Sequence, residues 1–410
     1  MDINRRALLK GAAAGAAGTA LAGGLLAAGA RADSGAAASA DPVAPDAVPF
    51  HGVHQAGIVG PVPQQRYSTH VALDVTAGTA ADLAALLRTV TARARFLTAG
   101  GTPADLGVGA PPSDSAVLGP VVPSDGLTVT LSVGASLFDD RFGLAAKKPA
   151  KLTAMPVFPD DTLQADKLHG DLLLQVCANS PDTVHHALRD IAKQTRGGMQ
   201  IRYRMDGFVS APRPSGAPRN LFGFKDGISQ PAAATFDDIV WVRSGTGEPA
   251  WAAGGSYHVL RFIRTLVEFW DRVSINEQQN MFGRHRDTGA PLDGNVETDV
   301  PDYAADPKGQ VIGLDSHIRL ANPRTAATAA SRILRRPYNY DLGVDSTGNL
   351  ECGLIFVCFQ QDVARQFEAT QHRLAGEPLV DYVQPFGGGY FFALPGVRDT
   401  DDWLGRGLLA

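Results

Sequence analysis

Strand and helix patterns follow one another in a fixed order along the first half of the chain, and that order limits the fold more than any other feature of the sequence. Apolar runs and alternating apolar residues predict four strands, at Tyr67–Val75, Leu127–Val133, Leu172–Cys177 and Met199–Val209. Apolar residues at helical spacing predict a helix at Thr79–Phe96, after the first strand, and another at Pro181–Gln194, after the third. The order β-α-β-β-α-β is that of a ferredoxin-like domain and predicts an α+β fold.

A similar order recurs, less cleanly, beyond a Gly- and Pro-rich stretch at residues 210–227. We expect three strands there, at Tyr257–Trp270, Leu350–Gln360 and Gly389–Leu394. A helix ending at Phe282 should begin with the capping box Ser274-Ile275-Asn276-Glu277, and another should span Val363–Leu374. The 410 residues are therefore expected to form two ferredoxin-like domains, at residues 62–212 and 213–410.

The N-terminus is typical of an export signal. Arg5 and Arg6 precede an Ala-, Gly- and Leu-rich run, and Ala30-Arg31-Ala32 offers small residues for cleavage. We expect residues 1–32 to be a twin-arginine signal peptide and residues 33–61 to be a linker. A membrane anchor is the weaker alternative, because the run is only weakly apolar. The twin-arginine translocase carries folded proteins, so the protein is expected in the periplasm or outside the cell, with its cofactor inserted beforehand.

The charge and the cysteines exclude some classes of partner. The net charge is −5, and cleavage of residues 1–32 would make it more negative, so nothing favours binding to nucleic acid or to an anionic membrane. Cys177, Cys352 and Cys358 lie in apolar, strand-like runs without metal-ligand spacing. They are expected to be buried thiols.

Two segments contain the residues most suited to chemistry. Gly223-Phe224-Lys225-Asp226-Gly227 sets a carboxylate between glycines, where the backbone can turn sharply and approach a flat ligand closely. The connection at residues 283–349 is about a sixth of the chain, too long for an idle loop, so function is expected there. It carries His317 among many arginines, which include Arg319, Arg324, Arg332, Arg335 and Arg336. So many arginines in an apolar stretch require anions to neutralise them.

A haem is one ligand that would use such residues. It offers two propionates, an iron that takes an axial ligand and, on the opposite face, a place where peroxide needs an acid-base group and a cation. His317, Asp226 and Arg335 could fill these roles. Each of them taken alone is more typical of an ordinary structural residue, because an Asp between glycines usually forms a turn and arginine runs are usually solvated. The residue types alone therefore leave the choice open.

The segments taken together resemble one family. Gly223-Phe224-Lys225-Asp226-Gly227 fits the GxxDG motif of the dye-decolorizing peroxidases. The run Ser316–Arg324, then Arg335-Arg336-Pro337-Tyr338, and finally Phe386–Gly396 are similar to the branch that includes the deferrochelatase/peroxidases. The resemblance extends from about Val62 to Leu404, and Pro337 departs from the Gly that many relatives have. It implies a dimeric α+β barrel built from the two ferredoxin-like halves, with haem b as cofactor.

The resemblance also implies roles for individual residues. His317 would be the proximal iron ligand, Asp226 the distal acid-base residue and Arg335 the distal arginine. Asp381 would accept a hydrogen bond from the proximal imidazole, with Asp315 and Glu351 as alternatives. Further haem contacts are expected from Gly227, Ile228, Ser229, Asn322, Pro323 and Arg324.

The expected activity is reduction of hydrogen peroxide to water with oxidation of bulky dyes or phenolic compounds. An Asp is mostly ionised at neutral pH, so oxidation should be fastest under acidic conditions. Bulky reductants are expected to react at surface aromatic residues, with Tyr338, Tyr340, Tyr390 and Trp403 as candidates.

The alternative function is a haem-binding, iron-scavenging protein, although a pure carrier has no need of Asp226 and Arg335. A homodimer and partners in iron uptake are compatible with the resemblance, whereas the dispersed Met and His residues do not support a copper or iron module.

Overall fold

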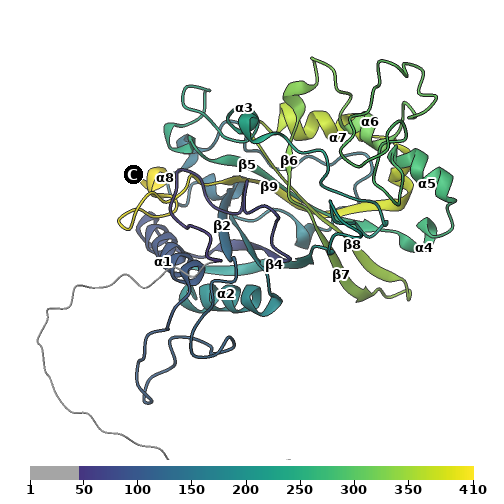
Figure 1. Ribbon diagram of the computed structural model, residues 1–410. Helices are drawn as coiled ribbons and strands as arrows, with labels where there is room; N and C mark the ends of the chain where they lie inside the picture. Colours follow the sequence, from purple (N-terminus) through teal and green to yellow (C-terminus); the bar gives the residue numbers. More distant parts are fainter. Residues whose placement is uncertain (1–45) are drawn as a thin grey trace, which may run out of the picture. The chain divides into compact units, whose positions relative to one another are not determined.

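A closed antiparallel barrel forms the centre of the protein in the computed structural model, which describes residues 46–410 (Figure 1). Eight strands form a ring in the order β5-β9-β2-β3-β1-β4-β7-β8, and β8 closes the ring by pairing with β5. The short β6 extends β7 along the same edge of β8. The strands are β1 (Tyr67–Val75), β2 (Thr128–Gly134), β3 (Leu172–Ala178), β4 (Met199–Phe208), β5 (Ser256–Thr265), β6 (Leu334–Arg335), β7 (Tyr338–Val344), β8 (Leu350–Gln360) and β9 (Val383–Ala393).

The first half has the expected β-α-β-β-α-β order. Helices α1 (Ala80–Ala99) and α2 (Pro181–Gln194) lie between the predicted strands, and both bury one face against the sheet. On α1, Leu83, Leu87 and Val90 recur at helical spacing and are fully buried. Burial of each large apolar side chain stabilises the packing of the helix on the sheet by about 1.5–3 kcal/mol. Thr79 caps α1 by accepting a hydrogen bond from the backbone N–H of Asp82 at 3.1 Å.

The second half repeats this order with more interruptions. Its α-helices are α3 (Phe236–Ile239), α4 (Val267–Trp270), α5 (Ile275–Phe282), α6 (His317–Ala321) and α7 (Ala369–Leu374), and α8 (Arg406–Leu409) ends the chain. Shorter turns are the 3₁₀ segments at Ala135–Phe138, Ala145–Lys147, Ala165–Lys167, Ala233–Thr235, Ala250–Ala252, Ala329–Ser331 and Pro378–Tyr382, and a π-helix at Ala364–Glu368. The expected capping box is present, with Ser274 and Glu277 each bonded to the backbone of the other. The fold class expected from the sequence, α+β with two ferredoxin-like halves in one barrel, is confirmed.

Two boundaries differ from those expected. The strand expected to reach Trp270 ends at Thr265 and is followed by α4. The last strand begins at Val383 rather than Gly389, because Gly387 and Gly388 carry no side chains from which an alternating pattern could be read. A Cβ on Gly388 would lie 2.0 Å from the carbonyl oxygen of Leu260, so only glycine allows β9 to lie this close to β5.

Residues 46–61 are not a free linker, although the sequence indicated one over residues 33–61. Ile58 is fully buried in the barrel, and the Gln55 amide donates to the carbonyl oxygens of Leu131 and Leu394. The segment has no periodic apolar pattern because it packs as an irregular strap. The remainder of that linker and the expected signal peptide lie outside the described residues. Within residues 46–410 no helix is long and apolar enough to cross a membrane, and Cys177, Cys352 and Cys358 are buried thiols.

Candidate active site

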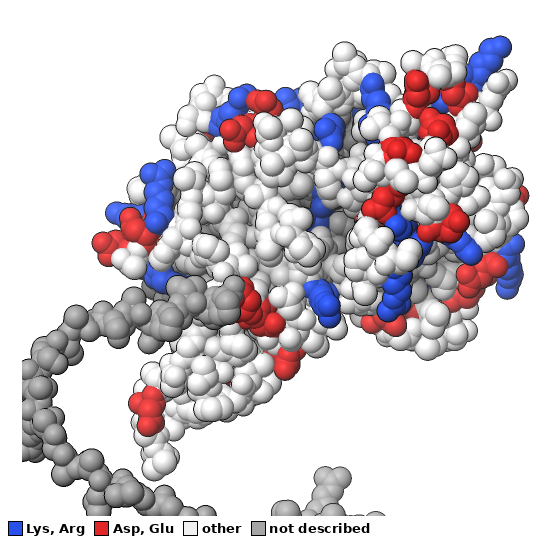
Figure 2. Space-filling view, in the orientation of Figure 1, with Lys and Arg blue, Asp and Glu red and all other residues white. Residues whose placement is uncertain are grey.

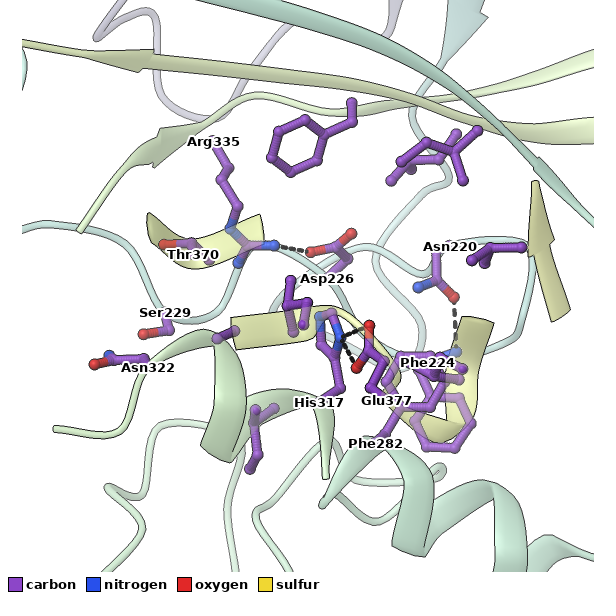
Figure 3. A pocket seen from close by; sticks show the side chains of 18 of the residues that line it. Asn220, Phe224, Asp226, Ser229, Phe282, His317, Asn322, Arg335, Thr370 and Glu377 are labelled. Carbon is purple, nitrogen blue, oxygen red and sulfur yellow. Dashed lines mark hydrogen bonds and ion pairs between the residues drawn. The ribbon is translucent and has the colours of Figure 1, made fainter. Parts of the chain in front are cut away.

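A cavity of about 290 Å³ lies against the outer face of the barrel, at β5, β8 and β9 (Figure 3). Helices α5, α6 and α7 supply part of the remaining wall. The segments that the sequence indicated meet here, because the lining includes Asp226, His317 and Arg335. Of the six further haem contacts expected, five line the cavity, namely Gly227, Ile228, Ser229, Asn322 and Arg324, whereas Pro323 does not.

His317 is the first residue of α6, directly after the buried N-cap residue Ser316. Its Nδ1 lies 2.8 Å from Oε2 and 3.1 Å from Oε1 of Glu377. An ionised carboxylate only accepts hydrogen bonds, so Nδ1 donates and the lone pair of Nε2 is left free for a ligand. Burial alone would lower the pKa of His317, but the Glu377 carboxylate outweighs it, by its charge and its hydrogen bond, and raises that pKa.

The partner of His317 corrects one expectation from the sequence. Asp381 does not accept the hydrogen bond of the imidazole, and neither Asp315 nor Glu351 does so. Glu377 directly precedes the 3₁₀ turn Pro378–Tyr382 and lines the cavity, whereas Asp381 lies within the turn and does not. Glu377 is buried, whereas Asp381 is exposed and lines a separate surface groove. The only signal for Glu377 was a carboxylate placed directly before a proline in a partly apolar segment.

Asp226 and Arg335 form an ion pair on the other side of the cavity, above His317 and Glu377 in Figure 3. Nη1 of Arg335 lies 2.7 Å from Oδ1 of Asp226, which also accepts the backbone N–H of Gly227 at 2.7 Å. Gly227 has φ +92°, and a Cβ there would meet no heavy atom within 4 Å. The backbone beside the carboxylate is therefore open to a ligand that lies flat against it.

Gln230 holds Arg335 in place, a role that sequence reasoning missed. Its side-chain amide donates to the carbonyl oxygen of Arg335 at 2.8 Å and accepts the N–H of the same residue at 3.1 Å. The backbone carbonyl of Gln230 also accepts a hydrogen bond from Arg332 at 2.6 Å. One residue next to the glycine motif thereby fixes two arginines of the cavity wall.

The other arginines of the wall fit an anionic ligand. Arg284, Arg324 and Arg332 all line the cavity, and none of them forms an ion pair with a carboxylate within residues 46–410. Burial lowers the pKa of Arg284 and of Arg332, because it disfavours their charge. On the face shown in Figure 2, by contrast, acidic and basic side chains are interspersed. Unneutralised guanidinium groups in the cavity, together with the free Nε2 of His317, match the donor set that haem requires.

An aromatic cluster connects His317 with the surface. The ring of Phe282 lies 6.0 Å from that of His317 and 5.8 Å from that of Trp270. Trp270 in turn lies 5.3 Å from Tyr382, which is partly exposed in a groove also lined by Phe269.

The aromatic residues named from the sequence are less accessible. Tyr338, Tyr340 and Tyr390 are buried to at least 98%, and Trp403 is partly buried against Arg88.

Comparison with known proteins gives consistent similarities over the whole described region. The sequence models named Dyp-type peroxidase, N-terminal, and Dyp-type peroxidase, C-terminal, match residues 55–209 and 217–398. The chain is 51% identical to a deferrochelatase of Escherichia coli O157:H7 and to one of Shigella flexneri, over 99% of this chain and 97% of each relative. Among solved structures, a DyP-type peroxidase from Cellulomonas bogoriensis is 35% identical with a TM-score of 0.80, covering 88% of this chain and 98% of that one. Ferric DtpA from Streptomyces lividans is 34% identical with a TM-score of 0.80, covering 88% and 97%.

Proposed function

Because this chain belongs to the Dyp-type peroxidase family and is a haem peroxidase, we propose that His317 would bind the haem iron and that Asp226 and Arg335, elsewhere in the same cavity, would act on hydrogen peroxide. One observation carries the proposal. A histidine whose Nδ1 is engaged by Glu377 shares a single cavity with a carboxylate and guanidinium pair. The same cavity is lined by Arg284, Arg324 and Arg332, which we assign to the haem propionates.

The protein residues then divide the work on peroxide. Haem b supplies an iron centre that accepts peroxide and provides the electrons for its cleavage. Asp226 takes the proton from one peroxide oxygen and delivers it to the other, which leaves as water. Arg335 stabilises the negative charge that develops on the departing oxygen. Glu377 orients the imidazole of His317 and makes it a stronger ligand, as a carboxylate behind a ligating histidine generally does.

A second function is favoured by the relatives named deferrochelatase, at 51% identity over nearly the whole chain. Removal of iron from haem would leave iron-free protoporphyrin, which fluoresces. Dye oxidation and porphyrin fluorescence, followed in one sample of the haem-loaded protein with and without peroxide, separate the two functions. Dye oxidation without fluorescence supports the peroxidase alone.

We propose that bulky reductants are oxidised at the groove around Tyr382. With haem bound in the cavity of about 290 Å³, little space would remain for a large dye. Trp270 and Phe282 provide consecutive aromatic contacts from Tyr382 to His317. In this scheme Tyr382 gives an electron inward and its phenolic proton to solvent, and the reductant restores both.

Replacing Tyr382 by Phe should lower the turnover of a bulky dye severalfold, because the phenol that gives up the electron is lost while the packing on Trp270 is kept. The rate of peroxide consumption in single-turnover mixing should not change. Tyr67→Phe is the matched control, since Tyr67 is also a partly exposed tyrosine but lies on β1. Unchanged dye turnover in the Tyr382 variant would exclude this route.

We also propose export by the twin-arginine translocase, as the first 32 residues suggest. Changing Arg5 and Arg6 together to Lys should leave full-length precursor in the cytoplasm, because the translocase reads the arginine pair. Fractionation followed by immunoblotting measures this. Processed protein outside the cytoplasm at normal levels would contradict the export proposal without affecting the roles in the cavity.

A further inference from the structure

The loop that carries Asp226 has no regular structure of its own. Between Ser215 and Gly227 there is neither helix nor strand, only turns and one isolated bridge between Arg219 and Lys225. An acid-base group must be held to a fraction of an ångström relative to the peroxide it serves. Something outside the loop must therefore fix its position.

Glu297, in the connection between α5 and α6, fixes the loop at two points. Its Oε2 accepts a hydrogen bond from Nζ of Lys225, the residue directly before Asp226. Its Oε1 accepts the backbone N–H of Ala217 at 3.0 Å. The two side chains of the ion pair are only 5% and 18% exposed for Lys225 and Glu297 respectively, so solvent screens the contact little.

The surrounding contacts fit closely around Lys225 and Glu297. Nζ of Lys225 also donates to the carbonyl oxygen of Ser215 at 2.9 Å, so it joins the two ends of the loop. Gly216 has φ +77°, and a Cβ there would lie 2.1 Å from Oε1 of Glu297. The backbone carbonyl of Glu297 accepts a hydrogen bond at 3.2 Å from Arg284, which lines the cavity.

We propose that Glu297 is a positioning residue for the reaction with peroxide, acting through Lys225 to hold Asp226 against Arg335. The inference rests on the proposed role of Asp226. Glu297 itself does not line the cavity, so its effect passes through the loop. This also gives the long connection at residues 283–349 a task beyond supplying His317 and the arginines.

A double-mutant cycle of Glu297 and Asp226 tests the proposal in the full-length, haem-loaded protein. Glu297→Gln keeps an acceptor for Ala217 but removes the charge that holds Lys225. We expect the rate of peroxide consumption in rapid mixing to fall roughly tenfold to a hundredfold, the range for a small displacement of a catalytic group. KM for the reductant should not change. In an Asp226→Asn background the same change should alter the rate less than twofold, because no acid-base group remains to be positioned.

Hydrogen exchange in the haem-free protein provides a second measurement. Glu297→Gln should speed amide exchange in residues 215–227 and leave α1 unchanged. Asp190→Asn is the matched control, because it removes the charge of the buried Asp190, which pairs with the partly exposed Arg93 between α2 and α1, away from the cavity. That control should leave the peroxide rate and the exchange of the loop as in the parent.

The outcomes separate this inference from the proposed function. If Asp226→Asn alone has no effect on the peroxide rate, the role of Asp226 is wrong and the inference falls with it. If Asp226→Asn slows the reaction but Glu297→Gln does not, or slows it equally in both backgrounds, only the inference is overturned. Should Glu297→Gln fail to fold, Lys225→Gln with Glu297→Gln leaves no unpaired charge and is compared in the same cycle.

Discussion

Replacing His317 by Ala is expected to abolish stable haem binding. Within the described cavity His317 is the only imidazole, and its Nε2 is left free because Glu377 engages Nδ1. Alanine removes the iron ligand and leaves the buried Glu377 carboxylate without its partner. The ratio of haem to protein after purification, together with the Soret absorption band, measures the loss.

His372→Ala is the control for this change, since His372 is an exposed residue of α7 whose ring packs on Phe158 at 5.8 Å. It should retain haem at the level of the parent. If the His317 variant kept an unchanged Soret band and full peroxidase activity, His317 would not be the ligand. His258 and His285 would then be the next residues to test, although His258 is fully buried inside the barrel.

Arg335→Leu and Asp226→Asn are expected to slow the peroxide step in different ways. Arg335 carries a fixed charge at any working pH, so its loss should slow the step at every pH, by roughly two to three powers of ten as for other preorganised charge stabilisers. Asp226 must change its protonation state during the reaction, so Asp226→Asn should also change the pH profile. An asparagine can still accept the hydrogen bonds of Gly227 and Arg335, so haem and the shape of the cavity should be retained.

Rapid mixing of each variant with hydrogen peroxide measures these rates. Both residues are expected to matter, without a fixed order between them. Haem content serves as the internal control, because neither side chain is assigned to the iron. If both variants react as fast as the parent, the distal assignment fails and a haem-binding function without peroxidase turnover becomes the better interpretation.

The sequence predicted the fold wherever side chains carry the periodic signal. The capping box at Ser274 and the strands of the first half are accurate to within one or two residues. The signal was absent in β9, where Gly387 to Gly389 have no side chains to alternate, and in the strap at residues 46–61, which packs without periodicity. Pairing between strands far apart in sequence, such as β2 with β9, was implied only by the family resemblance.

The sequence predicted which charged residues line the site, but it did not predict the contacts that hold them in place. The family resemblance identified Asp226, His317 and Arg335 as site residues, and all three line one cavity. It pointed to Asp381, with Asp315 and Glu351 as alternatives, and missed Glu377, because the contact of Glu377 with His317 depends on the path of the chain before the 3₁₀ turn Pro378–Tyr382. Gln230 and Glu297 were missed because they act on backbone groups and on Lys225, and contacts of that kind leave no pattern in a sequence.

Closure of the barrel by strands from both halves affects how the chain can be synthesised. β9 pairs with β2 of the first half and with β5 of the second, and it is the last strand of the barrel in sequence order. A nascent chain on the ribosome therefore exposes unpaired edges of β2 and β5 until β9 has left the exit tunnel. Because β9 also lines the cavity, the cavity is complete only after that moment, and chains truncated before β9 should be held by chaperones or degraded by proteases.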